Sequence, residues 1–150
     1  MKHRSPRLAT RAIIVEDGRL LLVNAYPGNR SDLWGAPGGG VEPGFSLPEN
    51  LRREVHEECG LEVEVGALAL VNEFRGARSG YRQVGLFFRC SVTRGALDPS
   101  WRDPAGIVHS CRFFAPSELP GIRLKPDSLP RIAFASDAPV FYDPLEEIVP

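Results

Sequence analysis

Three glutamates stand close together in the stretch RREVHEECG, which spans residues 52–60: Glu54, Glu57 and Glu58. Carboxylate oxygens are the ligands that hard divalent cations such as Mg²⁺ prefer. The same acids could instead form a solvated acidic face, which is the usual meaning of a run of charges. Their spacing of three and four residues would place all of them along one edge of a helix.

Local signals predict such a helix from Leu47 to Cys59. Ser46 followed three residues later by Glu49 matches a capping box, and Gly60 fits the left-handed position after the last turn. Apolar residues recur every four positions and form the expected buried stripe: Leu51, Val55 and Cys59. The glutamates then lie along the rim of that stripe, half covered.

The helix alone does not favour this acidic cluster. Glu54 and Glu58 are like charges four residues apart, and Glu57 and Glu58 lie in the last turn, where the helix dipole disfavours negative charge. Each effect costs a few tenths of a kcal/mol, up to about 1. Arg53, four residues before Glu57, offers the local compensation. A bound cation would remove the repulsion, but for this stretch taken alone a solvated acidic face is the more usual interpretation.

A glycine-rich segment, WGAPGGGVEPG at positions 34–44, leads directly into this helix. Glycine backbone lets carbonyl and amide groups approach an ion or a phosphate without a side chain in between. Taken alone, such a loop is weak evidence for a site. Joined to the acidic helix, it supplies the second half of one.

Together, the glycine segment and the helix resemble the Nudix box. The family pattern is Gly, five residues, Glu, seven residues, Arg-Glu, an aliphatic, any residue, Glu-Glu, any residue, Gly and an aliphatic. Positions 39–61 match eight of its nine defined positions, and Phe45 stands where the first glutamate belongs. The matching residues are Gly39, Arg53, Glu54, Val55, Glu57, Glu58, Gly60 and Leu61.

This resemblance implies hydrolysis of a nucleoside diphosphate linked to another moiety, with Mg²⁺ or Mn²⁺ as cofactor. By analogy with the family, Glu57 and Glu58 are direct metal ligands, and Glu54 is a further ligand or a base that orients water. The Gly38 carbonyl is a fourth candidate ligand. Arg53 would hold one of the carboxylates, Glu57 or Glu54, in place.

Phe45 departs from the family pattern, because its side chain can neither bind a cation nor accept a proton. We interpret it as a hydrophobic staple that precedes the Ser46 cap and packs near Asn50 or Leu51. The site would then have one carboxylate fewer, unless Glu42 or an acid from elsewhere compensates. An alternative hypothesis is therefore a weakened Nudix module that binds a nucleotide without turnover.

Other candidate residues lie outside the box. Family members draw a catalytic acid from a later segment. The first candidate here is Asp103 in the loop 97–106, and the second is Glu73. His109 could act as a base, but a lone histidine in a strand is more often structural. Candidates for contacts with phosphate or base are Arg75, Arg82 and Trp34, with Asp103, Arg78, Tyr81 and Trp101 as further possibilities.

The order of elements predicts the α+β class. Residues 12–15 and 20–23 flank an Asp-Gly turn and read as a β-hairpin. Strands are expected over 63–74, 83–93 and 108–114, and the second is so apolar that it should be central. Short helical segments are expected at 116–119 and 128–135. This order predicts helices packed on a mixed sheet, and the resemblance implies the Nudix α/β/α sandwich with a loop-helix-loop catalytic motif.

Composition limits the partners. A chain of 150 residues with 43% hydrophobic residues is expected to form one domain, spanning 1–150. A net charge of −1 without basic runs argues against long nucleic acids, and the absence of long apolar runs argues against a membrane span. We expect a cytoplasmic protein with reduced, buried cysteines and a small-molecule nucleoside diphosphate derivative as ligand. A homodimer is compatible with the sequence.

Overall fold

The structure is a computed structural model that describes residues 5–24, 31–76, 80–108, 110–143 and 146–148. Its elements, in chain order, are β1 (Arg7–Glu16), β2 (Arg19–Asn24), β3 (Leu33–Trp34), β4 (Gly38–Gly40), α1 (Leu47–Cys59), β5 (Glu62–Gly76), β6 (Arg82–Arg94), β7 (Ser110–Phe114), the 3₁₀ helix η2 (Pro116–Gly121), β8 (Arg123–Leu124), α2 (Leu129–Ala133), β9 (Phe141–Tyr142) and β10 (Glu146–Ile148).

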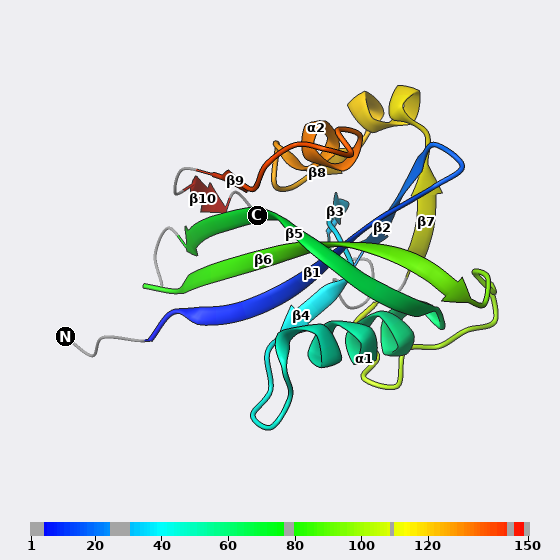
Figure 1. Cartoon of the computed structure of the whole chain (residues 1–150), viewed down its shortest axis with the longest axis horizontal. Coiled ribbons are helices and arrows are strands. Elements are labelled where there is room, and N and C mark those ends of the chain that lie inside the picture. Colours follow the sequence, from blue (N-terminus) through cyan, green and yellow to red (C-terminus); the bar gives the residue numbers. More distant parts are fainter. Residues whose placement is uncertain (1–4, 25–30, 77–79, 109, 144–145, 149–150) are drawn as a thin grey trace.

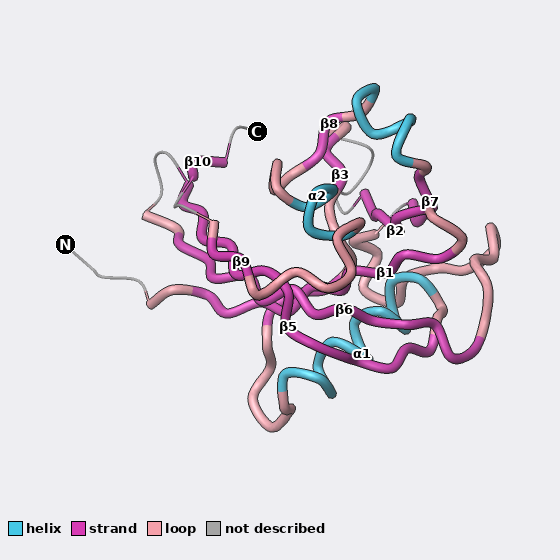
Figure 2. The backbone as a smooth tube through the Cα atoms, turned by 45° about the horizontal axis from the view of Figure 1, so that its top comes forward, coloured by secondary structure: helices cyan, strands magenta, loops and turns pink. Residues whose placement is uncertain are grey.

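A mixed sheet forms the middle layer, in the order β10-β5-β6-β1-β2-β7. Helix α1 covers one face of this sheet, and α2 lies on the opposite side (Figures 1 and 2). This arrangement confirms the predicted α+β class with helices on a mixed sheet. The apolar strand β6 lies between β5 and β1, as its sequence predicted.

Strand β1 organises the sheet because it pairs with three neighbours. It runs parallel to β6 from Arg7 to Ile14 and antiparallel to β4 from Ala9 to Arg11. At its end it turns into β2 through the predicted Asp-Gly turn, where Asp17 and Gly18 both have positive φ. The glycines of β4 are thereby fixed against the middle of β1.

Alternation along β1 divides the core between the two faces. Ala12 and Ile14 belong to the cluster that includes Leu51 and Val55 of α1. Ile13 belongs to the other cluster, which includes Leu129 and Ile132 of the second helix. Each face of the sheet thus carries its own apolar layer.

Some predicted boundaries shift. The strand predicted over 108–114 begins at Ser110 and not at Val108. The helix predicted over 128–135 is reduced to Leu129–Ala133. The two long strands extend past their predicted ends, since β5 and β6 pair along most of their length. In the described part of the chain, no helix is long and apolar enough to cross a bilayer.

Candidate active site

Helix α1 begins and ends where its sequence predicted. Ser46 Oγ accepts a hydrogen bond from the Glu49 amide at 3.2 Å, and a Glu49 carboxylate oxygen accepts one from the Ser46 amide at 3.0 Å. Gly60 adopts the left-handed conformation with φ of 70°. These caps fix the helix register, so the direction of each glutamate follows from its position in the sequence.

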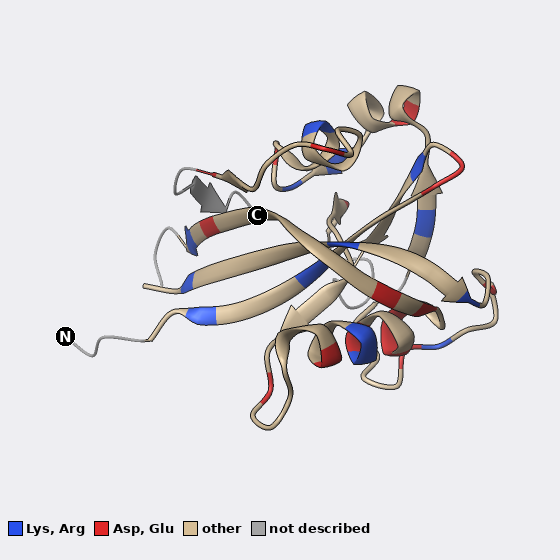
Figure 3. Cartoon of the chain, in the orientation of Figure 1, with Lys and Arg blue, Asp and Glu red and all other residues tan. Residues whose placement is uncertain are grey.

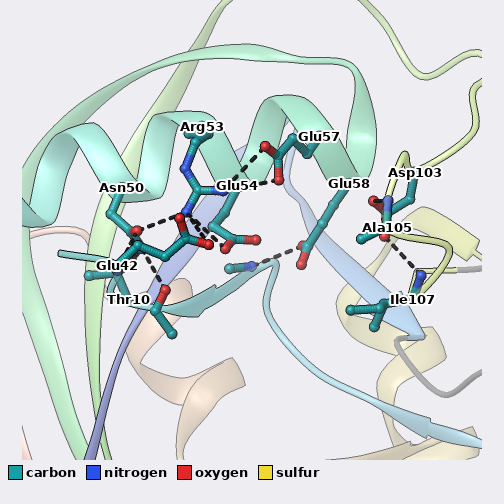
Figure 4. A network of polar contacts seen from close by, with 12 residues as sticks. Thr10, Glu42, Asn50, Arg53, Glu54, Glu57, Glu58, Asp103, Ala105 and Ile107 are labelled. Carbon is teal, nitrogen blue, oxygen red and sulfur yellow. Dashed lines mark hydrogen bonds and ion pairs between the residues drawn. The ribbon is translucent and has the colours of Figure 1, made fainter. Parts of the chain in front are cut away.

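Glu54 and Glu58 point from α1 toward the glycine segment (Figure 4). Glu58 is only 8% exposed, and its Oε2 accepts a hydrogen bond from the Gly38 amide at 3.0 Å. Glu54 lies against Gly39, where a Cβ would stand 2.8 Å from Glu54 Oε1. Any side chain at position 39 would therefore displace this carboxylate.

Arg53 binds several acceptors at the outer edge of the cluster. Its Nη1 donates to both carboxylate oxygens of Glu57, at 3.2 and 3.1 Å, and its Nη2 donates to Glu54 Oε1 at 3.3 Å. Glu42, the proposed compensating acid, forms a longer ion pair with the same Nη2 at 3.6 Å. The structure places Arg53 against both carboxylates that the sequence proposed for it.

The electrostatics of this region suit a cation. The pKa of Glu58 is raised to about 8, chiefly by burial and to a lesser extent by the charges of Glu54 and Asp103, while Arg11 and the Gly38 amide act against the rise. Burial also raises the pKa of Glu54. These shifts mean that the ionised carboxylates lack sufficient compensation from the protein alone.

Arg11 is a site residue that the sequence reasoning missed. Its Nη1 donates to the carbonyl oxygens of Gly38, at 3.0 Å, and Ala36, at 3.4 Å. Burial lowers its pKa, whereas the nearby charges of Glu58 and Glu54 raise it. A basic residue in the middle of an apolar strand, ATRAIIV, was the signal that could have found it.

Asn50 was also missed, although it joins α1 to the glycine segment. This fully buried side chain donates to Thr10 Oγ1 at 3.1 Å and to the Gly40 carbonyl at 3.2 Å. Its Oδ1 accepts from Arg53 Nη2 at 2.9 Å and from the Glu42 amide at 3.2 Å. Both ends of the amide are used, so Asn50 fixes the distance between helix and loop.

The interpretation of Phe45 as a hydrophobic staple is wrong. Its side chain is 41% exposed, and the position at which a staple would contact the helix is the polar, buried Asn50. The Arg53 guanidinium instead lies over the Phe45 ring, 5.0 Å from its centroid. Phe45 therefore contacts the site through Arg53, by a cation–π interaction.

A model of the NUDIX domain family matches residues 5–134. The chain belongs to the Nudix family. It is 26% identical over 139 residues to YjhB of Bacillus subtilis, whose name describes an ADP-ribose pyrophosphatase; the match covers 90% of this chain but only 62% of YjhB. It is 29% identical over 119 residues to the nucleoside triphosphatase NudI of Escherichia coli, covering 65% of this chain and 82% of NudI.

A crystal structure of a UDP-X diphosphatase superposes with a TM-score of 0.73 at 25% identity, covering 95% of this chain and 70% of that one. The predicted Nudix fold is therefore confirmed. The helix and the glycine segment described above carry the stretch that resembles the Nudix box, and both lie within the residues that the family model matches.

A cavity of about 500 Å³ lies beside the Nudix box and is lined in part by Glu58, Trp34 and Asp103. Trp34 is half-buried and packs edge-on against Phe114, with ring centroids 4.9 Å apart. Asp103 accepts three backbone hydrogen bonds, from Ala105, Ile107 and Val108, at 2.9 to 3.1 Å. These bonds of its carboxylate stabilise the conformation of the loop that forms one wall of the cavity.

The same cavity is lined by two of the three cysteines, all of which are free thiols. Cys59 Sγ and Cys111 Sγ lie 2.9 Å apart. This contact and burial raise the pKa of Cys59. Cys111 is only partly buried, so the expectation of buried cysteines holds for Cys59 and Cys90 but not for Cys111.

Arg75 and Arg82 do not line this cavity. Arg82 Nη2 donates to Glu73 Oε2 at 3.0 Å across the β5–β6 pair, and Arg75 lies on the exposed segment of β5 that pairs with β10. Glu73 also accepts from the Tyr142 hydroxyl at 2.6 Å, which makes it part of a surface network. His109 and Arg78, two further candidates, lie outside the described residues.

Among the described residues, no three histidine, cysteine or acidic side chains converge on one point as a metal-binding group would. The reason is visible in Figure 4: Arg53 holds Glu57 outward, while Glu58 turns inward to the Gly38 amide. The donor set nevertheless fits a hard cation, since it consists of carboxylate oxygens beside a glycine backbone that leaves room for them.

Proposed function

We propose that this protein is a divalent-cation-dependent pyrophosphohydrolase. Its substrate would be a nucleoside diphosphate linked to another moiety, such as a nucleoside triphosphate or a nucleotide-sugar of the ADP-ribose type. The observation that carries the proposal is the pair Glu54 and Glu58, which face the glycine segment beside a cavity of about 500 Å³. That volume is in the range of small-molecule sites, about 300–1,000 Å³.

Mg²⁺ or Mn²⁺ would be held by Glu54, Glu57 and Glu58, with the Gly38 carbonyl as a further candidate ligand. When bound, such an ion neutralises pyrophosphate oxygens and makes a water molecule a better nucleophile. Glu57 would have to turn away from Arg53 to take part. The Gly38 carbonyl already accepts from Arg11, but a carbonyl oxygen has a second lone pair.

The remaining catalytic roles fall to residues of α1. Where Glu54 is not a metal ligand, it is the candidate base: burial raises its pKa, so its carboxylate can take a proton from the attacking water. Arg53 is a positioning residue: it bonds Glu57, Glu54 and the buried Asn50, and thereby ties two acids to the fixed part of the loop.

The substrate class is supported by the names of relatives. YjhB, NudI and the UDP-X diphosphatase are all named for cleavage of nucleotide phosphoanhydrides. Trp34 and Asp103 line the cavity and remain candidates for contact with the nucleotide. Arg75 and Arg82 have weaker support, because neither lines it.

A second candidate function is nucleotide binding without turnover. The observation that favours it is Phe45, which replaces a carboxylate of the box and engages Arg53 through its ring. Against it stands the retained cluster of Glu54, Glu57 and Glu58, whose mutual repulsion would have no use in a module that does not bind metal.

The test is hydrolysis of a panel of nucleoside diphosphate derivatives with Mg²⁺ or Mn²⁺, followed as release of mononucleotide. Glu57→Gln should lower kcat at least tenfold, because the amide removes a charged ligand. Glu64→Gln, an exposed acid on β5, is the matched control and should leave kcat unchanged. If no compound is turned over but a nucleotide binds, the second function replaces the first.

Four broader expectations accompany this function. We propose one domain over 1–150, a cytoplasmic location and small-molecule partners, with a homodimer as an assembly to be tested by sedimentation. Because the chain spans 62% of the length of YjhB, none of these transfers from that relative.

A further inference from the structure

Two arginines of β1 share the face of the sheet that lies opposite α1. Thr10, Ala12 and Ile14 point toward α1 or its apolar cluster. Ile13 belongs to the cluster on the other face. Since side chains alternate along a strand, Arg7, Ala9 and Arg11 lie on the side of Ile13. Basic positions along β1 and acidic ones along α1 are marked in Figure 3.

The Arg11 side chain is half-buried and has no ion pair among the described residues. Within the described residues no carboxylate oxygen lies within 4.0 Å of its guanidinium, and Arg11 Nη1 donates hydrogen bonds to two backbone carbonyls. A guanidinium carries five N–H donors in a planar fork, which suits bidentate binding of phosphate. A half-buried cation satisfied only by carbonyls is costly unless a ligand completes its environment.

A metal at the Nudix box would leave Arg11 in need of an anionic partner. Arg53 and Arg11 lie among four carboxylates, those of Glu42, Glu54, Glu57 and Glu58, so the ionised cluster carries two excess negative charges. A bound dication would neutralise this excess. Arg11 would then lose the attraction of Glu58 and Glu54, its main electrostatic partners, to the metal. A phosphate group of a ligand could replace these carboxylates as the partner of Arg11.

Arg7 extends this basic strip along β1. Its Nη2 lies over Gly40, where a Cβ would stand 2.7 Å from it, and its Nη1 donates to Gln83 Oε1 at 2.9 Å and to the Tyr81 hydroxyl at 3.3 Å. These neutral acceptors hold the guanidinium close to the glycine segment. Its charge is not neutralised by any carboxylate within ion-pair distance in the described part of the chain.

We propose that Arg11 binds a phosphate group of the substrate next to the Nudix box, and that Arg7 contacts the same anion from farther along β1. The inference rests on the proposed function but concerns binding and not cleavage. Neither residue belongs to the box. The bonds of Arg11 to the carbonyls of Gly38 and Ala36 hold the guanidinium at the glycine segment, and the Gly38 amide is bonded to Glu58 of α1.

The experiment is calorimetric titration with α,β-methylene-ADP, whose methylene bridge resists hydrolysis, in the presence of Mg²⁺. Arg11→Gln should raise Kd about 10- to 100-fold, the range for loss of a hydrogen bond between charged groups. Arg11→Lys should recover part of the affinity, and Arg7→Gln should have a smaller effect. Arg19→Gln, an exposed arginine of β2, is the matched control and should bind as the wild type does.

A purely structural Arg11 would behave differently. Its loss would lower Tm and leave Kd unchanged under conditions where the variant is folded. Equal affinities of wild type and Arg11→Gln, or no binding of the analogue by the wild type, would overturn the inference. Binding that depends on Arg11 in a protein that hydrolyses nothing would overturn the proposed function alone, so the two failures are distinguishable.

Discussion

At the scale of single residues, Glu58 couples the site to pH. Its buried carboxyl has a pKa of about 8, above the ordinary value of 4.5, so the folded protein holds a proton that the unfolded chain releases. Between these two values the folded state binds more protons, and stability falls as pH rises. Each pKa unit corresponds to about 1.4 kcal/mol, so the pH-dependent change in the free energy of unfolding is at most a few kcal/mol.

We therefore predict that, with EDTA present, the free energy of unfolding of the wild type decreases from pH 5 to pH 8. Glu58→Gln cannot ionise and should show a much flatter profile. Urea denaturation at a series of pH values measures both. A wild-type profile as flat as that of Glu58→Gln would mean that Glu58 is ionised in the folded protein despite its burial.

Phe45 offers a second prediction at this scale. Phe45→Glu would restore the acid of the family pattern within reach of Arg53, whereas Phe45→Ala only removes the ring. We expect Phe45→Glu to bind Mg²⁺ several-fold more tightly than the wild type, because one more carboxylate faces the cluster. Phe45→Ala should cost no more than about 1 kcal/mol of stability, the size of an exposed cation–π contact.

The measurement is the rise in Tm with increasing MgCl₂ for the three proteins. If Phe45→Glu and Phe45→Ala respond to MgCl₂ alike, the missing carboxylate does not limit metal binding. In that case the new carboxylate forms an ion pair with Arg53, and the substitution has only rearranged the ion pairs at the edge of the box.

At the scale of elements, the end of α1 depends on Gly60 for two reasons. Its φ of 70° disfavours a side chain, and a Cβ would lie 2.8 Å from Trp101 Cδ2. The Trp101 indole also donates to the Glu57 carbonyl at 2.9 Å and packs edge-on against His56. The loop 97–106, which forms a cavity wall, thus packs on the last turn of α1.

Gly60→Ala should therefore destabilise the protein by about 1–2 kcal/mol from the left-handed conformation alone, and by more once Trp101 is displaced. Gly121→Ala is the matched control, because a Cβ there meets nothing within 4 Å. Urea unfolding compares the two, and near-UV circular dichroism follows Trp101. Equal stabilities of the two variants would show that the helix end relaxes freely.

At the scale of the whole molecule, both apolar clusters share one sheet. Trp34 packs against the cluster on the side of the second helix, and Trp101 contacts the end of α1. If residues 1–150 form one cooperative domain, both sides should unfold together. Trp101→Phe and Trp34→Phe each leave one tryptophan, on one side of the sheet. Within each variant, the urea midpoint measured by fluorescence should then equal the midpoint measured by far-UV circular dichroism.

Much of the fold and half of the site followed from local sequence. The capping box, the Asp-Gly turn and the central apolar strand are short-range or periodic patterns, and each appeared where it was predicted. Helix α1 carries its own register, so the directions of Glu54, Glu57 and Glu58 followed as well. The resemblance to the Nudix box can be recognised in the sequence for the same reason, because the helical part of the motif is one continuous element.

The rest was decided by contacts between distant segments. Arg11 reaches Gly38 only because β1 pairs with β4. The Asp103 carboxylate accepts hydrogen bonds from three amides of its own loop, which its position in the sequence did not indicate. Phe45 was misread because the helix position opposite it is occupied by Asn50, which is buried through bonds to Thr10 and Gly40. The sequence determined which groups could do the chemistry, and tertiary pairing decided which of them meet, because a strand's neighbours are set by the whole sheet.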